Sequence, residues 1–384
     1  MDRGLYSTDH ELYRETVQRF VEHEVVPKQS EWDAQRLIGR DTWLAAGRQG
    51  LVGLSGPERF GGLGLTDYRF RNVIHEELAK VGAAALTSSL SLQDDIVMPY
   101  FVSLATAEQQ QRWLSGICGG ELIAAIAMTE PSTGSDLRAI KTSGRRVPTG
   151  WMVNGAKTFI TSGIQADVVV VVARTDPAAG RDGFTLFVVE DGMPGFTRGR
   201  KLDKVGLAAQ DTAELFFDDV LVPADNVLGA VGGAFNELMR NLPLERLSIA
   251  AAAIASADAA LAWTLDYVQQ RTAFGQPIAD FQNTRFVLAE VSTELDVTRA
   301  YVDRAVVAVG EGRLSAVEAA KAKWWATDVQ GRVIDRLLQL FGGYGYMLEF
   351  PIAQAWKDAR VQRIFGGTNE IMKEIIGRDL VGRR

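Results

Sequence analysis

Cysteine and histidine are both scarce in this chain of 384 residues, which contains one cysteine, Cys118, and three histidines. A single cysteine cannot form a disulfide within the chain, so we expect a reducing, cytoplasmic setting, with a mitochondrial matrix origin left open. A zinc site needs more of these ligands than the sequence offers, so we expect no metal. The shortage of histidine also leaves few bases for a Ser-His-Asp site, and no G-x-S-x-G element is present.

Positive charge and long apolar runs are also limited. Lysine and arginine number 41 against 48 aspartates and glutamates, which disfavours a nucleic-acid binder because phosphate neutralisation needs a basic surface. The most apolar segments, 249–262 and 168–173, are shorter than the roughly 20 residues that a membrane span needs, and residues 1–15 predict no signal peptide. The hydrophobic content of 47% predicts a large core in two or three domains.

Hydrophobic periodicity divides the chain into three predicted domains and predicts an α+β fold. Residues 1–122 form the N-terminal helical domain, with helices over 11–26 and 68–81 and a further helix start at Thr106. Residues 123–230 form the middle domain, an antiparallel β-barrel or sandwich. Its predicted strands cover residues 151–160, 167–174, 184–190 and 214–221, with turn groups such as Asn154-Gly155 separating or interrupting them.

The third domain, residues 231–384, is predicted to be a C-terminal four-helix bundle. Its helices are expected over residues 242–271, 281–310, 315–341 and 352–359, followed by 369–381. Pro243 suits the first turn of the first of these helices, with Asn241 as a candidate cap.

Two polar strings in the middle domain are candidate binding sites. Residues 127–136, Ala-Met-Thr-Glu-Pro-Ser-Thr-Gly-Ser-Asp, predict a strand that enters a turn rich in backbone N–H groups and hydroxyls; this suits a phosphate or carbonyl group, or is an ordinary polar turn. Residues 154–163, Asn-Gly-Ala-Lys-Thr-Phe-Ile-Thr-Ser-Gly, are not a P-loop because no helix follows the lysine. Phe159 and Thr161 share one strand face by alternation, which suits a planar polar ring or core packing.

Three further strings place glycines at predicted helix ends beside polar side chains. They are residues 271–278 with Gln282, residues 339–346, and residues 358–371. Each one alone is compatible with an ordinary helix terminator. Together and in this order, however, the five strings resemble the acyl-CoA dehydrogenase family of flavoproteins, over about residues 5–381.

The resemblance implies FAD as cofactor and an acyl-CoA thioester as substrate, whose α and β carbons lose two hydrogens to give a trans-2-enoyl-CoA. It implies electron transfer to an electron-transfer flavoprotein. It also implies a homo-oligomer, expected to be a tetramer, because two chains complete one FAD site.

The resemblance assigns FAD contacts to three groups of residues. The first lines the isoalloxazine and ribityl part and comprises Met128, Thr129, Gly134, Ser135, Phe159, Ile160 and Thr161. The second reaches the FAD of a neighbouring subunit and comprises Arg271, Phe274, Gln282, Gln339, Gly342 and Gly343. The third lies at a helix start and comprises Thr368, Asn369 and Glu370.

The family reaction needs one carboxylate as general base. In many members this glutamate directly precedes the Gly-Thr of the last string, where this chain has Gly366. A second subset, including long-chain and isovaleryl types, carries it on the helix after the β domain, where Glu245 matches. Burial would raise the pKa of Glu245, whereas a helix N-terminus and Arg246 would lower it. The residues alone are also compatible with a helix-start glutamate favoured by the dipole.

Substrate contacts are expected from six residues by the same resemblance, with the N–H of Gly366 as one donor to the thioester oxygen. They are Ser135, Asn236, Pro243, Arg246, Gly366 and Gly367. A basic run, Arg198 to Lys204, is expected either to meet CoA phosphates or to be a solvated loop. The long-chain type favours long or branched acyl chains. Alternatives are an acyl-CoA oxidase, a flavin monooxygenase on the same scaffold, or a non-catalytic CoA-binding relative.

Overall fold

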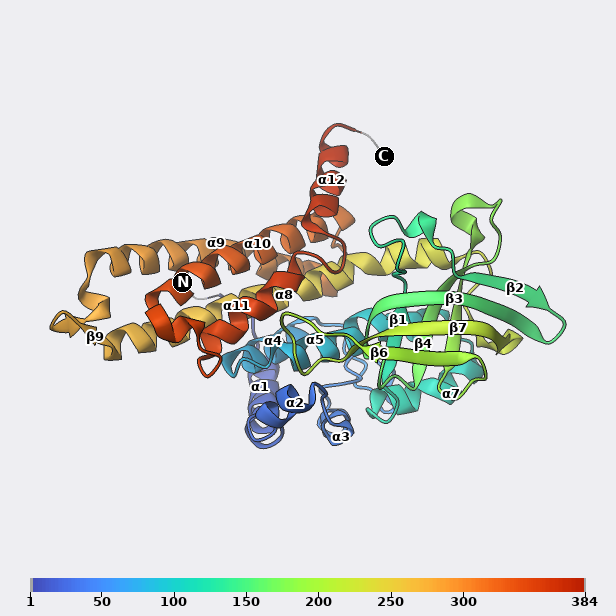
Figure 1. Ribbon diagram of the computed structural model, residues 1–384, viewed down its shortest axis with the longest axis horizontal. Coiled ribbons are helices and arrows are strands. Elements are labelled where there is room, and N and C mark those ends of the chain that lie inside the picture. The colour runs from blue at the N-terminus through green and yellow to red at the C-terminus, as the bar shows by residue number, and fades with distance from the viewer. Residues whose placement is uncertain (1–2, 383–384) are drawn as a thin grey trace.

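The computed structural model describes residues 3–382 and places a β region beside two sets of helices (Figure 1). The N-terminal helices are α1 (Thr8–Phe20), α2 (Gln29–Gln35), α3 (Arg40–Arg48), α4 (Arg69–Lys80), α5 (Ala84–Ser91), α6 (Met98–Leu104) and α7 (Ala107–Cys118). The predicted helix 11–26 is α1 continued by a π-helical segment, Val21–Val25. Thr106 caps α7 as predicted, because its side chain accepts the N–H of Gln109.

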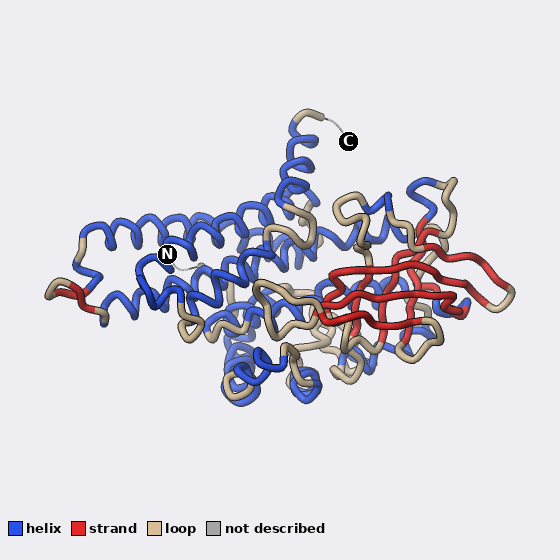
Figure 2. Tube along the Cα trace, viewed as in Figure 1, coloured by secondary structure: helices blue, strands red, loops and turns tan. Residues whose placement is uncertain are grey.

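The middle region forms an eight-stranded sheet within the described residues (Figure 2). Its strands are β1 (Ala124–Ala127), β2 (Ser143–Val147), β3 (Gly150–Thr161), β4 (Val168–Arg174), β5 (Phe184–Glu190), β6 (Phe196–Lys201), β7 (Thr212–Pro223) and β8 (Val227–Leu228). The predicted strands correspond to β3, β4, β5 and β7, and the strand expected to enter the turn at residues 127–136 is β1. Strands β2, β6 and β8 were not predicted. Pairing is mostly antiparallel, but β1 joins β4 in parallel.

Strand β4 is apolar at every position from Val168 to Ala173 because both of its faces are buried. Val168, Val170 and Val172 pack with helices α6 and α7. Val169, Val171 and Ala173 pack inside the curled sheet against β3, β5 and β7. A strand covered on both faces has a continuous hydrophobic run rather than an alternating one.

The Asn154-Gly155 pair was wrongly interpreted as a turn, because it lies inside β3 at an irregularity in the pairing with β7. Gly155 has φ of +151°, and a Cβ at this position would collide with Thr142. The glycine therefore permits a close approach of two segments rather than a chain reversal. Asn154 bonds across to Asp219 on β7.

The C-terminal bundle confirms the predicted fold class. Its helices are α8 (Ala234–Gln270), α9 (Gln282–Gly310), α10 (Ala316–Leu340) and α11 (Pro351–Gln362), with α12 (Asn369–Leu380) projecting from it (Figure 1). The prediction that α8 begins at residue 242 was wrong, since it begins at Ala234 and carries Pro243 in its interior. Asn241 is therefore not a helix cap. Proline removes one helical hydrogen bond. Helix α8 tolerates this loss because helical turns continue on both sides of Pro243 and because the helix packs against α10.

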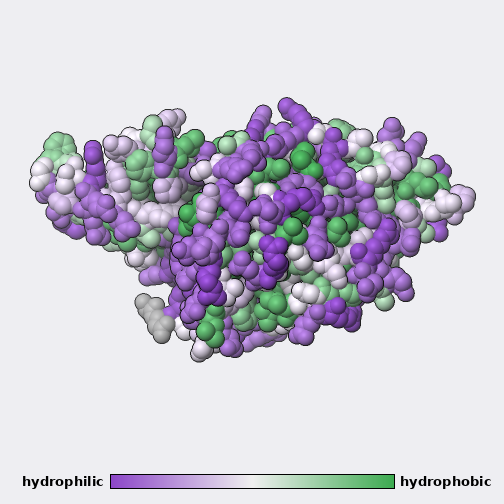
Figure 3. Space-filling view, turned by 90° about the horizontal axis from the view of Figure 1, so that it is seen from below, coloured by the Kyte–Doolittle hydropathy of each residue, from purple (hydrophilic) through white to green (hydrophobic). Residues whose placement is uncertain are grey.

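Helix α8 is long and apolar enough to cross a membrane by length and composition alone, but 67% of its most apolar window is buried inside the protein. Burial against α9 and α10 accounts for its composition, as in the core helix of a bundle. Seen from below, hydrophobic residues are scattered over the surface among hydrophilic ones (Figure 3).

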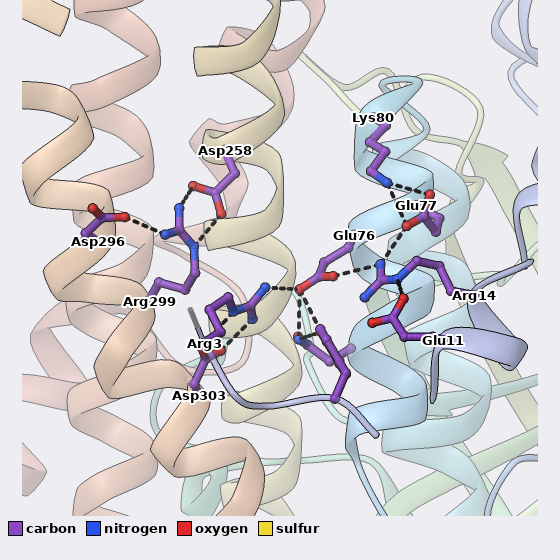
Figure 4. A network of polar contacts seen from close by, with 12 residues as sticks. Arg3, Glu11, Arg14, Glu76, Glu77, Lys80, Asp258, Asp296, Arg299 and Asp303 are labelled. Carbon is purple, nitrogen blue, oxygen red and sulfur yellow. Dashed lines mark hydrogen bonds and ion pairs between the residues drawn. The ribbon is translucent and has the colours of Figure 1, made fainter. Parts of the chain in front are cut away.

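A network of ion pairs joins the N-terminal segment to the bundle (Figure 4). Arg3 bonds both Glu76 on α4 and Asp303 on α9, and Arg14 on α1 bonds Glu76 and Glu77. Partly exposed pairs of this kind each contribute about 0–1 kcal/mol. Their main consequence is positional, because they hold α1 and α4 beside α9.

Candidate functional site

A cavity of about 720 Å³ lies where the three regions meet. Its walls come from α4 and α5, from the segment after β1, from the end of β3, from α8, and from the Arg363–Thr368 strap that joins α11 to α12. A volume of this size suits a small-molecule or cofactor site. The cavity brings together Met128, Thr129, Gly134, Ser135, Phe159, Ile160, Thr161, Glu245, Arg246, Gly366 and Gly367.

The turn after β1 is fixed by a buried ion pair that sequence analysis missed. The Nζ of Lys157 on β3 donates to the carbonyl of Met128 at 2.9 Å and to Oε1 of Glu130 at 3.0 Å. Glu130 also accepts the backbone N–H groups of Lys141 and Thr142. Burial lowers the pKa of Lys157 to about 8, although Glu130 opposes the change. A lysine inside an apolar strand was the available signal, because such a group needs a buried partner.

The end of β3 presents Phe159, Ile160 and Thr161 to the cavity. Phe159 has φ of +59° and lies where the pairing of β3 with β7 shifts register. The expected alternation of Phe159 and Thr161 is therefore broken by a bulge, and Ile160 between them lines the same cavity. Phe159 remains 67% exposed, so its ring is available to a ligand.

Glu245 lies on the cavity wall with its side chain buried to 3% exposure. Burial raises its pKa to about 7, while Arg246 and a hydrogen bond from Tyr100 act to lower it. Because α8 begins at Ala234, Glu245 is about three turns inside the helix. The predicted opposing effect of the helix N-terminus is therefore wrong, since that field is confined to the first turn.

Tyr100 on α6 contacts Glu245, a partner that sequence analysis missed. Its hydroxyl donates to Oε1 of Glu245 at 3.4 Å. Only packing of α6 against α8 brings together two residues so far apart in the chain. The hydrogen bond favours the ionised carboxylate.

Tyr100→Phe is expected to raise the pKa of Glu245, because the substitution removes a donor to its charged form. A reaction that needs the ionised base should then reach half of its maximal rate at a higher pH. At pH 6 we expect a rate about two- to tenfold below that of the unmodified protein. The pH profile of flavin reduction measures the shift, with Tyr13→Phe as a partly buried control whose hydroxyl donates to the carbonyl of Gly50 instead. An unchanged profile would remove Tyr100 from this role.

The strap presents Gly366 and Gly367 to the cavity in left-handed conformations, with φ of +63° and +90°. A Cβ at Gly366 would collide with Cδ1 of Ile249 on α8. A side chain at this position would need both a strained backbone and a shift of α8 side chains. The local geometry thus favours glycine, and the backbone N–H remains as the group that position 366 can offer.

Of the remaining residues expected to contact the substrate, one lines the cavity and two do not. Arg246 lines the cavity and is 6% exposed, with its Nε lacking a partner among the described residues. Asn236 is exposed, and neither it nor Pro243 lines the cavity. In the basic run, Arg198 bonds the carbonyls of Gly163 and Ala166. Lys201 and Lys204 also bond backbone carbonyls, so the CoA-phosphate alternative for this run gains no support.

Two of the predicted cofactor strings meet at the other end of the bundle. The guanidinium of Arg271 lies over the ring of Tyr344 at 5.5 Å, which places it beside Gly342 and Gly343. Arg271 follows α8 about 39 Å beyond Glu245 along the helix axis, from 1.5 Å per residue. Phe274 nearby is 97% exposed, and Gln282 and Gln339 lie at ends of α9 and α10. None of these residues lines the cavity of its own chain.

The third predicted group surrounds the start of α12. Thr368 caps this helix by accepting the N–H of Ile371, and Glu370 is exposed in its first turn. Asn369 is buried and bonds Lys323 and Thr327 on α10. The side chain of Asn369 is thus occupied within the protein rather than turned to the cavity.

The cavity residues fit a planar cofactor with a polar rim. Met128, Phe159 and Ile160 supply flat or apolar contacts. Thr129, Ser135 and Thr161 add hydroxyls that can bond ring heteroatoms. Within residues 3–382, no group of three or more histidine, cysteine, aspartate or glutamate side chains is arranged to hold a metal ion.

Comparison with known proteins relates this geometry to one family. Family models for the N-terminal, middle and C-terminal domains of acyl-CoA dehydrogenase match residues 7–121, 125–220 and 233–381. The chain is 45% identical to the long-chain specific acyl-CoA dehydrogenase of Sus scrofa, covering 99% of this chain and 88% of that protein.

Two solved structures extend the comparison. An acyl-CoA dehydrogenase from Geobacillus kaustophilus has a TM-score of 0.95 and 45% identity, with 98% and 99% of the two chains covered. A glutaryl-CoA dehydrogenase from Mycobacterium smegmatis in complex with FADH2 has a TM-score of 0.91 and 26% identity, with 99% and 96% covered.

Proposed function

Because this chain belongs to the acyl-CoA dehydrogenase family, we propose that it oxidises long-chain or branched acyl-CoA thioesters with Glu245 as the general base. One observation carries the proposal: a carboxylate with a pKa near 7 is buried on the wall of the cavity that also holds the predicted flavin-facing residues. A base with a pKa close to the working pH combines ionisation with strong proton affinity.

FAD is the cofactor, and Met128, Thr129, Gly134, Ser135, Phe159, Ile160 and Thr161 would hold its ring system in the cavity. When bound, FAD supplies the acceptor for the hydride that leaves the β-carbon of the substrate. Glu245 takes the proton from the α-carbon, and its burial keeps competing water away from the carboxylate. The N–H of Gly366 donates to the thioester oxygen, which acidifies the α-proton. Arg246 and Gly367 border the same ligand.

Small side chains leave room for the acyl chain between α4, α5 and α8. Ala79, Ala84, Thr87, Ala252 and Ser256 line this part of the cavity, and Trp263 lies farther along α8. The similarity to a long-chain specific enzyme supports the same substrate class. We propose Asn236, in the first turn of α8, and Pro243, in its interior, as further contacts to the CoA portion.

The proposal includes a homotetramer and an electron-transfer flavoprotein as the electron acceptor. In such an assembly Arg271, Phe274, Gln282, Gln339, Gly342 and Gly343 would complete the FAD site of a neighbouring subunit, and Thr368, Asn369 and Glu370 would complete the cofactor contacts at the start of α12. The exposure of Phe274 supports a role that needs a second chain. The single, buried cysteine fits a reducing compartment, for which we propose the cytoplasm.

Anaerobic titration with acyl-CoA thioesters, from butyryl-CoA to stearoyl-CoA, tests the reaction and the substrate class. We expect long-chain thioesters to bleach the bound flavin fastest, with a trans-2-enoyl-CoA as product. Oxygen consumption in the presence of substrate should stay slow compared with reduction of an artificial acceptor. Rapid oxygen consumption would instead indicate an oxidase, and a flavin that no acyl-CoA reduces would contradict the proposal.

A further inference from the structure

Lys323 on α10 is a fully buried lysine that the reaction described above does not use. Its side chain is 0% exposed. Its Nζ donates to the carbonyl of Gly367 at 2.7 Å and to Oδ1 of Asn369 at 3.0 Å. Burying a lysine costs free energy unless its amino group finds hydrogen-bond partners. Both partners of Lys323 lie on one short segment, residues 367–369, which suggests that the lysine holds this segment.

Both acceptors belong to the strap or to the residue that follows it. The strap consists of Arg363–Thr368, and the N–H of Asn369 bonds the carbonyl of Arg363 across its base. Gly366 and Gly367 lie at its apex in left-handed conformations. Neither glycine has a side chain with which to pack, and glycine loses more conformational freedom on ordering than any other residue. Contacts to the backbone must therefore hold the apex in place. Lys323 on α10 provides one of them, the hydrogen bond to the carbonyl of Gly367.

We propose that Lys323 is a positioning residue, which clamps the strap so that the N–H of Gly366 points at the thioester oxygen. The inference deepens the proposed function and rests on it, because it assumes the thioester contact at Gly366. Lys323 does not line the cavity, so its effect on a ligand bound there is indirect. It acts through the carbonyl of Gly367, which lies two peptide units along the chain from the N–H of Gly366.

The clamp does not depend on the charge of Lys323. Burial lowers the pKa of Lys323 to about 7; the nearby Arg246 and Arg363 lower it further, while Glu370 opposes them. A neutral amine retains two hydrogens, which match the two acceptors at Gly367 and Asn369. Thr327 also bonds Asn369, so the far end of the clamp stays anchored to α10 in both states.

A structural role alone is the competing explanation, in which Lys323 merely fills space beneath the strap. Lys323→Met in the FAD-bound enzyme separates the two, because methionine retains most of the volume and donates no hydrogen bond. Lys321→Met is the matched control, since Lys321 lies on the same helix and is half-buried. If the Lys323→Met protein does not fold, Lys323→Leu, which also donates no hydrogen bond, replaces it in the same comparison.

The first measurement uses an acyl-CoA analogue with sulfur in place of the β-carbon, which keeps the thioester carbonyl but cannot be oxidised. Infrared spectroscopy of its isotope-labelled carbonyl reports how strongly the bound oxygen is polarised. We expect the wild-type enzyme and Lys321→Met to lower the carbonyl frequency on binding. In Lys323→Met the frequency should return toward the value in water. The affinity for free CoA, which has no acyl carbonyl, should not change.

The second measurement is kinetic, and we expect kcat of Lys323→Met to fall about 10²-fold, as when one oxyanion donor is lost. Amide hydrogen exchange of residues 364–369 should accelerate in Lys323→Met and not in Lys321→Met. A Lys323→Met enzyme that retains the wild-type carbonyl frequency, or whose strap exchanges at the wild-type rate, would overturn the inference alone. A wild-type enzyme that never lowers the frequency would instead contradict the thioester contact itself.

Discussion

Glu245→Gln is expected to slow flavin reduction by acyl-CoA by about 10²- to 10⁴-fold while leaving FAD bound. Glutamine has nearly the shape of glutamate but cannot accept the α-proton. Glu245 is buried beside the cavity residues, and Gly366 at the other family position cannot replace it. Stopped-flow absorbance under anaerobic conditions measures the rate, and the visible spectrum of the purified protein reports the bound flavin.

The matched control for this prediction is Glu237→Gln. Glu237 lies about two turns earlier on α8, forms an ion pair with Arg240, and does not line the cavity. Its substitution should leave flavin reduction within about twofold of the wild-type rate. Flavin reduction by Glu245→Gln at an undiminished rate would remove Glu245 from its role.

Glu245→Gln should slow the reaction but stabilise the folded protein at high pH. The sign of the stability change follows from the raised pKa of Glu245. Glu245 titrates near 4.5 when unfolded and near 7 when folded, so folding becomes less favourable as pH rises from about 4.5 to about 7 and the buried group ionises. Glu245→Gln removes this cost. We expect the variant to unfold at a higher temperature than the wild type at pH 8, and to lose that advantage at pH 4.5.

Arg71→Met is expected to cost about 3–5 kcal/mol of unfolding free energy, the largest stability effect among our predictions. Arg71 on α4 is 2% exposed and pairs with Asp94 and, at 3.3 Å, with Asp95. Without the guanidinium, two carboxylates lose their buried counter-ion. Burial already raises the pKa of Asp95 despite the help of Arg71. Urea unfolding monitored by tryptophan fluorescence measures the change.

Loss of Arg71 also disturbs the candidate site. Asp95 accepts a hydrogen bond from the hydroxyl of Ser248 at 2.5 Å, and Ser248 lies one turn beyond Glu245 on the cavity wall.

Arg69→Met is the control for Arg71→Met. Arg69 lies two residues earlier on the same helix and pairs with Asp67 at a partly exposed position, so its loss should cost at most about 1 kcal/mol. Equal losses in the two variants would show that the buried network carries no special stability.

Local patterns in the sequence reached the site only partly. The strings at residues 127–136 and 154–163 pointed to two cavity walls because small hydroxyl and glycine residues cluster there in sequence. The Lys157–Glu130 ion pair and the contact of Tyr100 with Glu245 were not predicted, because the partners are distant in the chain and a charged or phenolic side chain does not reveal its partner. Pro243 misled the prediction of α8, since proline is usual in a first turn but a buried interior can also tolerate it.

The sequence alone predicts the α+β fold and the order of its parts, because burial of one face imposes a period on helices and strands that the order of apolar and polar residues reveals. It also determined that Gly366 cannot be the base. The packed structure was needed to show that Glu245 lines a cavity and has a pKa near 7, and that Lys323 bonds the strap. Desolvation and long-range pairing depend on which surfaces the packed helices cover, and no local pattern of residues encodes that.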